Sequence, residues 1–160
     1  MNDIMLDTTY ILPILGIQVK LQSFTEIFPK LLSHYRLLYN PISIAEAKWI
    51  VLKIFKETHN RNLLKRFRIG LTSLLNDQRL EQTILTDSEI EEVADLLLVR
   101  ANVKDYFDRV IYATAVRYQA ILLTEDQVLH SIFKRNDVPK PADVISWGKL
   151  CRDKFNLARG

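Results

Sequence analysis

The sequence predicts an α/β fold, a three-layer α/β/α sandwich with a central parallel sheet of about five strands. Short apolar runs alternate with longer amphipathic segments along the chain. The length of 160 residues, 48% of them hydrophobic, suits one domain with a substantial core. Only four glycines and five prolines are present, which argues against a turn-rich all-β fold. We therefore expect a single domain over residues 1–160.

Five short apolar runs have the length of strands that are buried on both faces. They are Ile4–Leu6, Ile42–Ile44, Gln82–Leu85, Ala120–Leu123 and, more weakly, Asp143–Ser146. Because helical segments separate these runs, the strands should pair in parallel through right-handed crossovers. Ligands of such sheets bind outside the carboxyl ends of the strands, so chemistry is expected just after each run.

The segments between the expected strands have helical periodicity. The expected helices are Phe24–Tyr35, Ile44–Thr58, Leu63–Leu75, Glu89–Arg100, Tyr106–Tyr118 and a last one that runs to Phe133. His59-Asn60 is a break between two of them, and Pro13–Gly16 should end the first helical segment early.

Charge and cysteine content bear on the partners and the cellular location that we expect for the protein. A net charge of +3 permits nucleic-acid binding without demanding it. Cys151 is the single cysteine, which excludes an internal disulfide and favours a reducing, cytoplasmic location. The apolar N-terminal stretch lacks a basic leader and contains Asp7 and Pro13, so neither a signal peptide nor a membrane segment is expected.

Acidic residues recur close to the carboxyl ends of the expected strands, where parallel sheets bind their ligands. Asp7 follows the first strand, and Asp126 lies just past the fourth. Glu46 lies one turn into the helix after the second strand, and Asp108 one turn into the helix that leads to the fourth.

Each acid also has a purely structural interpretation. Ser43-x-x-Glu46 has the spacing of a capping box, and Asp105 is a good N-cap that would make Asp108 an N3 carboxylate. Asp87 and either Thr124 or Asp126 could likewise cap helices. Taken together the acids are harder to explain, because two charges 4 Å apart repel by about 4 kcal/mol at an effective dielectric constant near 20. A hard divalent cation, Mg²⁺ or Mn²⁺, bound by carboxylate oxygens would offset this repulsion.

Four segments of the chain, in this order, resemble the motifs of the PIN domain family. They are Leu6-Asp7-Thr8-Thr9, Ile44-Ala45-Glu46-Ala47, Phe107–Ala115 with its Asp108, and Ala120–Asp126, which ends in Thr-x-Asp. The third and fourth segments together are fairly specific, and the resemblance runs from Asp7 to about His130.

The resemblance implies a PIN-like fold and a Mg²⁺- or Mn²⁺-dependent endoribonuclease. It implies that Asp7, Glu46, Asp108 and Asp126 are catalytic metal ligands, with the hydroxyl of Thr124, and less directly that of Thr8, orienting water or metal. Many single-domain members are VapC-type toxins that pair with a small antitoxin and form dimers, so both partners are expectations here. The long section between Glu46 and Thr83 is equally compatible with a stand-alone RNA-processing enzyme.

Other functions remain open at this stage. A non-catalytic PIN-like module would bind RNA or protein without cutting. A phosphatase of the haloacid dehalogenase type needs Asp-x-Asp after its first strand, but the second residue after Asp7 is Thr9. The acids also do not fall in the pattern of a receiver domain.

Basic and aromatic residues give weaker signals. Arg109 could contact substrate or balance the acids. Trp49 and Trp147 are interpreted as core or interface residues rather than base-stacking platforms. One further group is either an RNA-backbone patch or, the favoured interpretation, a solvated helix face: Lys53, Lys56, Arg61, Lys65, Arg66 and Arg68.

Overall fold

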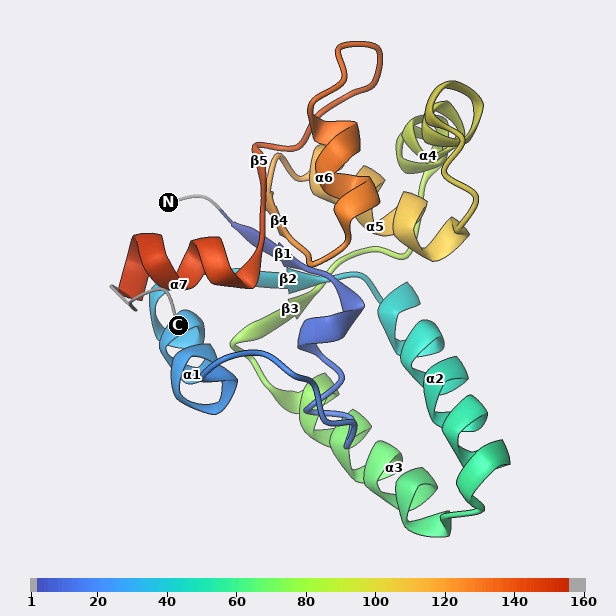
Figure 1. The fold of residues 1–160 in the computed structure, drawn as a ribbon, viewed down its shortest axis with the longest axis vertical. Coiled ribbons are helices and arrows are strands. Elements are labelled where there is room, and N and C mark those ends of the chain that lie inside the picture. Colours follow the sequence, from blue (N-terminus) through green and yellow to red (C-terminus); the bar gives the residue numbers. More distant parts are fainter. Residues whose placement is uncertain (1–2, 156–160) are drawn as a thin grey trace.

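Five parallel strands form one sheet in the order β3-β2-β1-β4-β5 in a computed structural model that describes residues 3–155 (Figure 1). The strands are β1 (Ile4–Leu6), β2 (Leu37–Tyr39), β3 (Leu80–Gln82), β4 (Ile121–Leu123) and β5 (Asp143–Ile145). The helices are η1 (Thr8–Tyr10), α1 (Phe24–His34), α2 (Ile42–Thr58), α3 (Arg61–Asn76), α4 (Ser88–Ala101), α5 (Tyr106–Arg117), α6 (Gln127–Phe133) and α7 (Trp147–Phe155). The predicted three-layer α/β architecture is confirmed.

The alternation of side chains along the strands divides the core into two layers. Ile4 and Leu6 of β1 pack on one face of the sheet, in a cluster that includes residues of α1, α3 and α7. Met5 faces the opposite way and packs in a cluster that includes residues of α4, α5 and α6. Because both faces are covered, the three inner strands β1, β2 and β4 are apolar, as expected for a parallel sheet, whereas the edge strands β3 and β5 also contain Glu81, Gln82 and Asp143.

The strand order places a topological switch point between β1 and β4. The chain leaves β1 towards β2 on one side and leaves β4 towards β5 on the other. Leu6 is in register with Leu123, so the residues that follow them, Asp7 and Thr124, emerge side by side. Such a point is where ligands of open α/β sheets bind.

The second strand lies earlier in the chain than the sequence indicated. Ile42–Ile44, predicted as a strand, is the first turn of α2, and β2 is Leu37–Tyr39 instead. Pro41, with φ of −59°, is already set for a helix start, and Asn40 Oδ1 accepts the Ile42 N–H at 2.8 Å. The proline and the asparagine cap therefore outweigh the strand propensity of the isoleucines.

The third strand also ends earlier than predicted. It spans Leu80–Gln82 rather than Gln82–Leu85. The buried amide of Asn40 explains the difference, because its Nδ2 donates to the carbonyls of Ile84 and Leu85 at 3.2 and 2.9 Å. Those carbonyls bind a side chain instead of extending the sheet.

Most helices begin and end close to their predicted limits. Asn60 accepts the Asn62 N–H and begins α3, which confirms the break at His59-Asn60. The segment Pro13–Gly16 does interrupt the first helical stretch, which is reduced to the short η1. Cys151 is buried and unpaired. None of the helices in residues 3–155 combines the length and hydrophobicity that a bilayer-spanning segment needs.

Gly70 of α3 allows the helix to pack directly on the Pro13–Gly16 segment. A Cβ at position 70 would clash with the Ile14 carbonyl oxygen and lie 2.8 Å from Leu15 Cα, both backbone atoms. We expect Gly70→Ala to lower the free energy of unfolding by about 3 kcal/mol, the upper end of the overpacking range. Urea unfolding measures this change. Gly148→Ala in α7 is the control, because its Cβ would meet only Arg152 Nη1 at 3.5 Å. Equal stability of Gly70→Ala and the wild type would contradict this packing.

Candidate active site

The carboxylate of Asp7 is fixed at the carboxyl end of β1. The residue is 8% exposed, and its Oδ1 accepts the Thr8 backbone N–H at 2.7 Å. Its Oδ2 accepts the hydroxyl of Thr124, which follows β4, at 2.5 Å. Burial raises the pKa of Asp7, with smaller increases from Asp126 and Asp105, and the two hydrogen bonds oppose the rise.

Glu46 of α2 is held beside Asp7 by the Thr8 hydroxyl. Thr8 Oγ1 donates to Glu46 Oε2 at 2.5 Å and lies 3.0 Å from the Ser43 hydroxyl. Because Thr8 has a single hydroxyl proton, its oxygen is left to accept from Ser43. The alternative interpretation of Ser43 and Glu46 as a capping box is therefore wrong, since both side chains contact Thr8 and the Asn40 side chain accepts the Ile42 N–H at the start of α2. Burial raises the pKa of Glu46, and the charges of Asp7 and Asp105 add to this.

Asp126 combines a cap with a place in the site. Its Oδ1 accepts the backbone N–H groups of Val128 and Leu129 at 2.7 and 3.3 Å, which makes it the N-cap of α6. Its own N–H donates to Thr124 Oγ1 at 3.0 Å. Thr124 is fully buried and so links Asp126 to Asp7. The cap interpretation and the site interpretation of Asp126 thus both fit its position.

The surroundings of Asp108 raise its pKa strongly. It lies in the first turn of α5, which Asp105 caps by accepting the N–H groups of Phe107 and Asp108. Burial, followed by the negative charges of Asp105, Asp7, Asp126 and Glu46, raises the pKa of Asp108 to about 7. Negative charge therefore accumulates here without a matching cation among residues 3–155, because no ion pair there includes Asp7, Glu46, Asp108 or Asp126.

All four predicted acids line one pocket of about 320 Å³. It lies outside the carboxyl ends of β1 and β4, at the switch point of the sheet. The lining residues are Asp7, Thr8, Thr9, Leu12, Glu46, Ile50, Asp108, Glu125 and Asp126. Asp87, by contrast, caps α4 through the Ile90 N–H and does not line this pocket. The sequence-based expectation that these distant acids converge is confirmed.

The donor set fits a hard divalent cation. It consists of carboxylate and hydroxyl oxygens, the ligands that Mg²⁺ and Mn²⁺ prefer, and the accumulated negative charge would favour a cation. Within the described part of the chain, however, no three Asp, Glu, His or Cys side chains are grouped in a way that would hold a metal ion as they stand.

Arg109 and Glu125, which are adjacent in sequence to acids of the site, make structural contacts. Arg109 was a candidate to contact substrate or balance the acids, and its Nη1 instead donates to the backbone carbonyls of Val103 and Lys104. Glu125 turns away from Asp126, and its Oε1 accepts the Tyr10 hydroxyl at 2.7 Å and the Trp147 N–H at 2.6 Å. It anchors α7 to η1.

Sequence reasoning missed the contacts that two polar residues make behind the acids. Ser43 and Asn40 are both completely buried. Asn40 Nδ2 also donates to the Thr114 hydroxyl at 2.9 Å, which ties the end of β2 to α5 and so helps to place Asp108. The available signal in the sequence was an Asn directly before a Pro, at a place where a helix could start.

Comparison with known sequences decides the family. The sequence profile of the PIN domain matches residues 4–135, which include all four acids. The chain belongs to the PIN domain family. No curated protein is significantly similar to it in sequence.

Solved structures share this PIN fold at low sequence identity. The VapBC2 structure from Rickettsia felis, bound to a DNA fragment from its promoter, is similar with a TM-score of 0.61 and 17% identity, over 90% of this chain and 98% of that one. PAE2754 from Pyrobaculum aerophilum has a TM-score of 0.58 and 14% identity, over 93% and 92%. FitAB bound to the IR36 DNA fragment has a TM-score of 0.51 and 17% identity, over 90% and 94%. At these identities the likeness shows the fold alone.

The Thr124 hydroxyl gives a first test of how this PIN pocket is organised. If this pocket carries the metal-dependent nuclease activity that is typical of the family, Thr124→Val should lower that activity about 10- to 100-fold, the range found when a residue that orients metal ligands is lost. Valine has nearly the same shape but neither donates to Asp7 nor accepts from Asp126. Thr124→Ser keeps the hydroxyl and should retain most activity. Steady-state rates of RNA cleavage measure both variants, and equal rates for the two would show that the hydroxyl is not needed.

Proposed function

We propose that this PIN domain protein is a divalent-metal-dependent endoribonuclease. The observation that carries the proposal is the convergence of Asp7, Glu46, Asp108 and Asp126 on one pocket at the switch point of the sheet. Family membership supports it, because PIN domains are typically nucleases. Mg²⁺ or Mn²⁺ is the proposed cofactor, held by these four carboxylates.

The residues of the pocket would act in distinct ways. A bound cation would activate water and neutralise charge on the scissile phosphate. Asp7 has both oxygens fixed, by Thr8 and by Thr124, so its orientation is set before a ligand arrives. Without a cation Asp108 has a pKa of about 7, and a bound cation would favour its ionised form and offset the repulsion from the neighbouring acids. The expected products carry a 5′ phosphate and a 3′ hydroxyl.

A protein partner and self-association belong to the same proposal. Two of the structures with this fold are of VapBC2 and FitAB bound to DNA fragments. We infer that a small antitoxin-like protein could bind this chain, that the chain could form a homodimer, and that it works in the cytoplasm. Size-exclusion chromatography with light scattering tests the dimer, and co-purification with the product of an adjacent short gene tests the partner.

The direct test of the proposal is cleavage of a single-stranded RNA oligonucleotide labelled at its 5′ end. With Mn²⁺ or Mg²⁺ the purified protein should yield shorter products whose new ends carry a 5′ phosphate, and excess EDTA should stop the reaction. RNA retention in a gel shift without any metal-dependent product, for substrates of varied sequence, would instead establish a non-catalytic RNA-binding module.

A further inference from the structure

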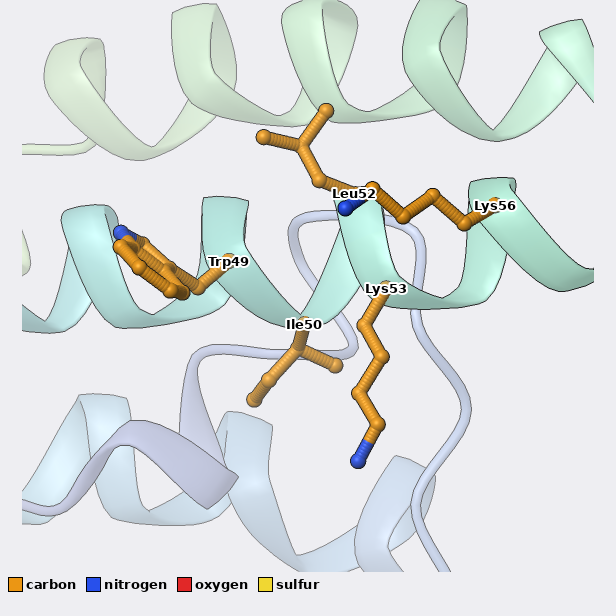
Figure 2. Close-up of a pocket in the computed structure, with 5 residues that line it drawn as sticks. All are labelled: Trp49, Ile50, Leu52, Lys53 and Lys56. Atoms are coloured by element: carbon orange, nitrogen blue, oxygen red, sulfur yellow. The ribbon is translucent and has the colours of Figure 1, made fainter.

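One large aromatic side chain on α2 is exposed to solvent. Trp49 is 72% exposed, whereas Trp147, the other tryptophan, is 2% exposed. Of the two sequence-based interpretations of Trp49, as a core or an interface residue, the exposure therefore excludes the core. Trp49 lines an open hollow of about 490 Å³ whose other lining residues are Ile50, Leu52, Lys53 and Lys56, all on α2 (Figure 2).

This hollow adjoins the acid pocket. Ile50 lines both of them. Glu46 precedes Trp49 by three residues and Lys53 by seven, so the three lie along one stripe of the helix. At 1.5 Å per residue, Lys53 and Lys56 lie about 10 and 15 Å from Glu46 along the helix axis. A chain that leaves the acid pocket over α2 would thus pass Trp49 first and the two lysines next.

The helices α2 and α3 carry a concentration of unpaired positive charge. They form a hairpin whose connecting turn lies far from the sheet (Figure 1). They contain seven basic residues and two acidic ones, a net +5, so the remaining 15 basic and 17 acidic residues of the chain sum to −2. Within residues 3–155 none of the seven lies within 4.0 Å of a carboxylate: Lys48, Lys53, Lys56, Arg61, Lys65, Arg66 and Arg68.

We propose that single-stranded RNA runs along α2 from the acid pocket, with one base stacked on Trp49 and the following phosphates beside Lys53 and Lys56. Aromatic rings bind unpaired bases of any sequence, and lysines contact the backbone. Single strands are specified because the bases of a duplex are not free to stack on a side chain. This inference rests on the proposed function. An RNA strand that is cut in the acid pocket must leave it over one side, and α2 forms one side through Glu46 and Ile50.

Tryptophan fluorescence tests the stacking contact directly. Binding of a twelve-nucleotide oligouridylate in EDTA should quench the emission of Trp49, while buried Trp147 serves as an internal reference. Trp49→Leu keeps an apolar side chain but should weaken binding roughly 5- to 150-fold, the range for losing one stacked base. Trp49→Phe keeps a ring and should retain most of the affinity. In both variants the remaining Trp147 emission should not respond to RNA.

The salt dependence of binding tests the two lysines. Because each phosphate contact on a single strand contributes about 0.7 to the slope of log K against log salt, Lys53→Ala with Lys56→Ala should reduce the slope by about 1.4. The matched control is Lys30→Ala with Lys154→Ala, which removes the same charge from α1 and α7 and should leave the slope nearly unchanged.

The outcomes separate this inference from the proposed function, because binding is measured without metal. The RNA path would be overturned if oligouridylate bound Trp49→Leu as tightly as the wild type and did not quench the fluorescence of the wild type. This holds even if the protein cuts RNA. Unchanged RNA binding together with loss of a co-expressed protein partner in Trp49→Leu would reassign the hollow to protein docking. Quenching of Trp49 by RNA in a protein that cleaves no RNA would support the RNA path and contradict the proposed nuclease function.

Discussion

Asp7→Asn should abolish metal-dependent RNA cleavage, with a fall in rate of about 1,000-fold or more. The reason is that a metal ligand supplies several kcal/mol of transition-state stabilisation, and Asn removes the charge that attracts the cation. Asn also preserves the shape of Asp7, and its oxygen can still accept the Thr8 N–H. Single-turnover cleavage of labelled RNA in Mn²⁺ measures the change.

The control for this variant is Glu125→Gln, an isosteric change of another acid that lines the same pocket. The Gln oxygen can still accept from Tyr10 and Trp147, so the fold should persist. We expect its cleavage rate to stay within a few fold of the wild type. If Asp7→Asn cut RNA as fast as Glu125→Gln, Asp7 would have no catalytic role.

Asp108→Asn should stabilise the metal-free protein at pH 8 and change it little near pH 3.5. In the folded wild type Asp108 holds its proton up to a pKa of about 7, whereas its ordinary pKa is 3.8. The folded state therefore binds more protons between these values, and the wild type loses stability as the pH rises through them. Asparagine has no such proton to lose, so the variant should lack this decline.

The size of this effect follows from the pKa change. A rise from 3.8 to about 7 corresponds to roughly 4 kcal/mol, and because Asp108 is partly exposed we expect about 1–3 kcal/mol at pH 8. Urea unfolding in EDTA at several pH values measures it. Saturating Mn²⁺ should raise the midpoint of thermal unfolding for the wild type at pH 8 and much less for the variant. Parallel pH profiles for the two proteins would contradict the charge crowding inferred around Asp108.

The sequence indicated which acids share a pocket better than it indicated where the strands begin and end. Asp7 and Asp126 follow apolar runs that are the two central strands at the switch point, so their convergence depends only on β1 and β4, which were both found correctly. Glu46 lies in the pocket, as predicted, although the predicted position of the strand before it was wrong. The reason is that α2 still begins just before Glu46.

What the sequence could not predict depends on contacts between distant residues. The end of β3 is set by the side chain of Asn40, more than forty residues away, and no local pattern contains that contact. The exposure of Trp49 is similar, because a tryptophan within an apolar helical segment indicates burial until the packing of α2 is known. Ser43 had the spacing of a capping box, but its hydroxyl contacts Thr8 across the fold instead.

The most direct test of the metal site is the anomalous diffraction of a crystal soaked in Mn²⁺ at a concentration that supports cleavage. We predict a manganese peak inside the pocket lined by Asp7, Glu46, Asp108 and Asp126, and no such peak in a crystal of Asp7→Asn treated in the same way. A soaked wild-type crystal with manganese bound elsewhere and none in this pocket would contradict the claim that these four carboxylates form one divalent-metal site.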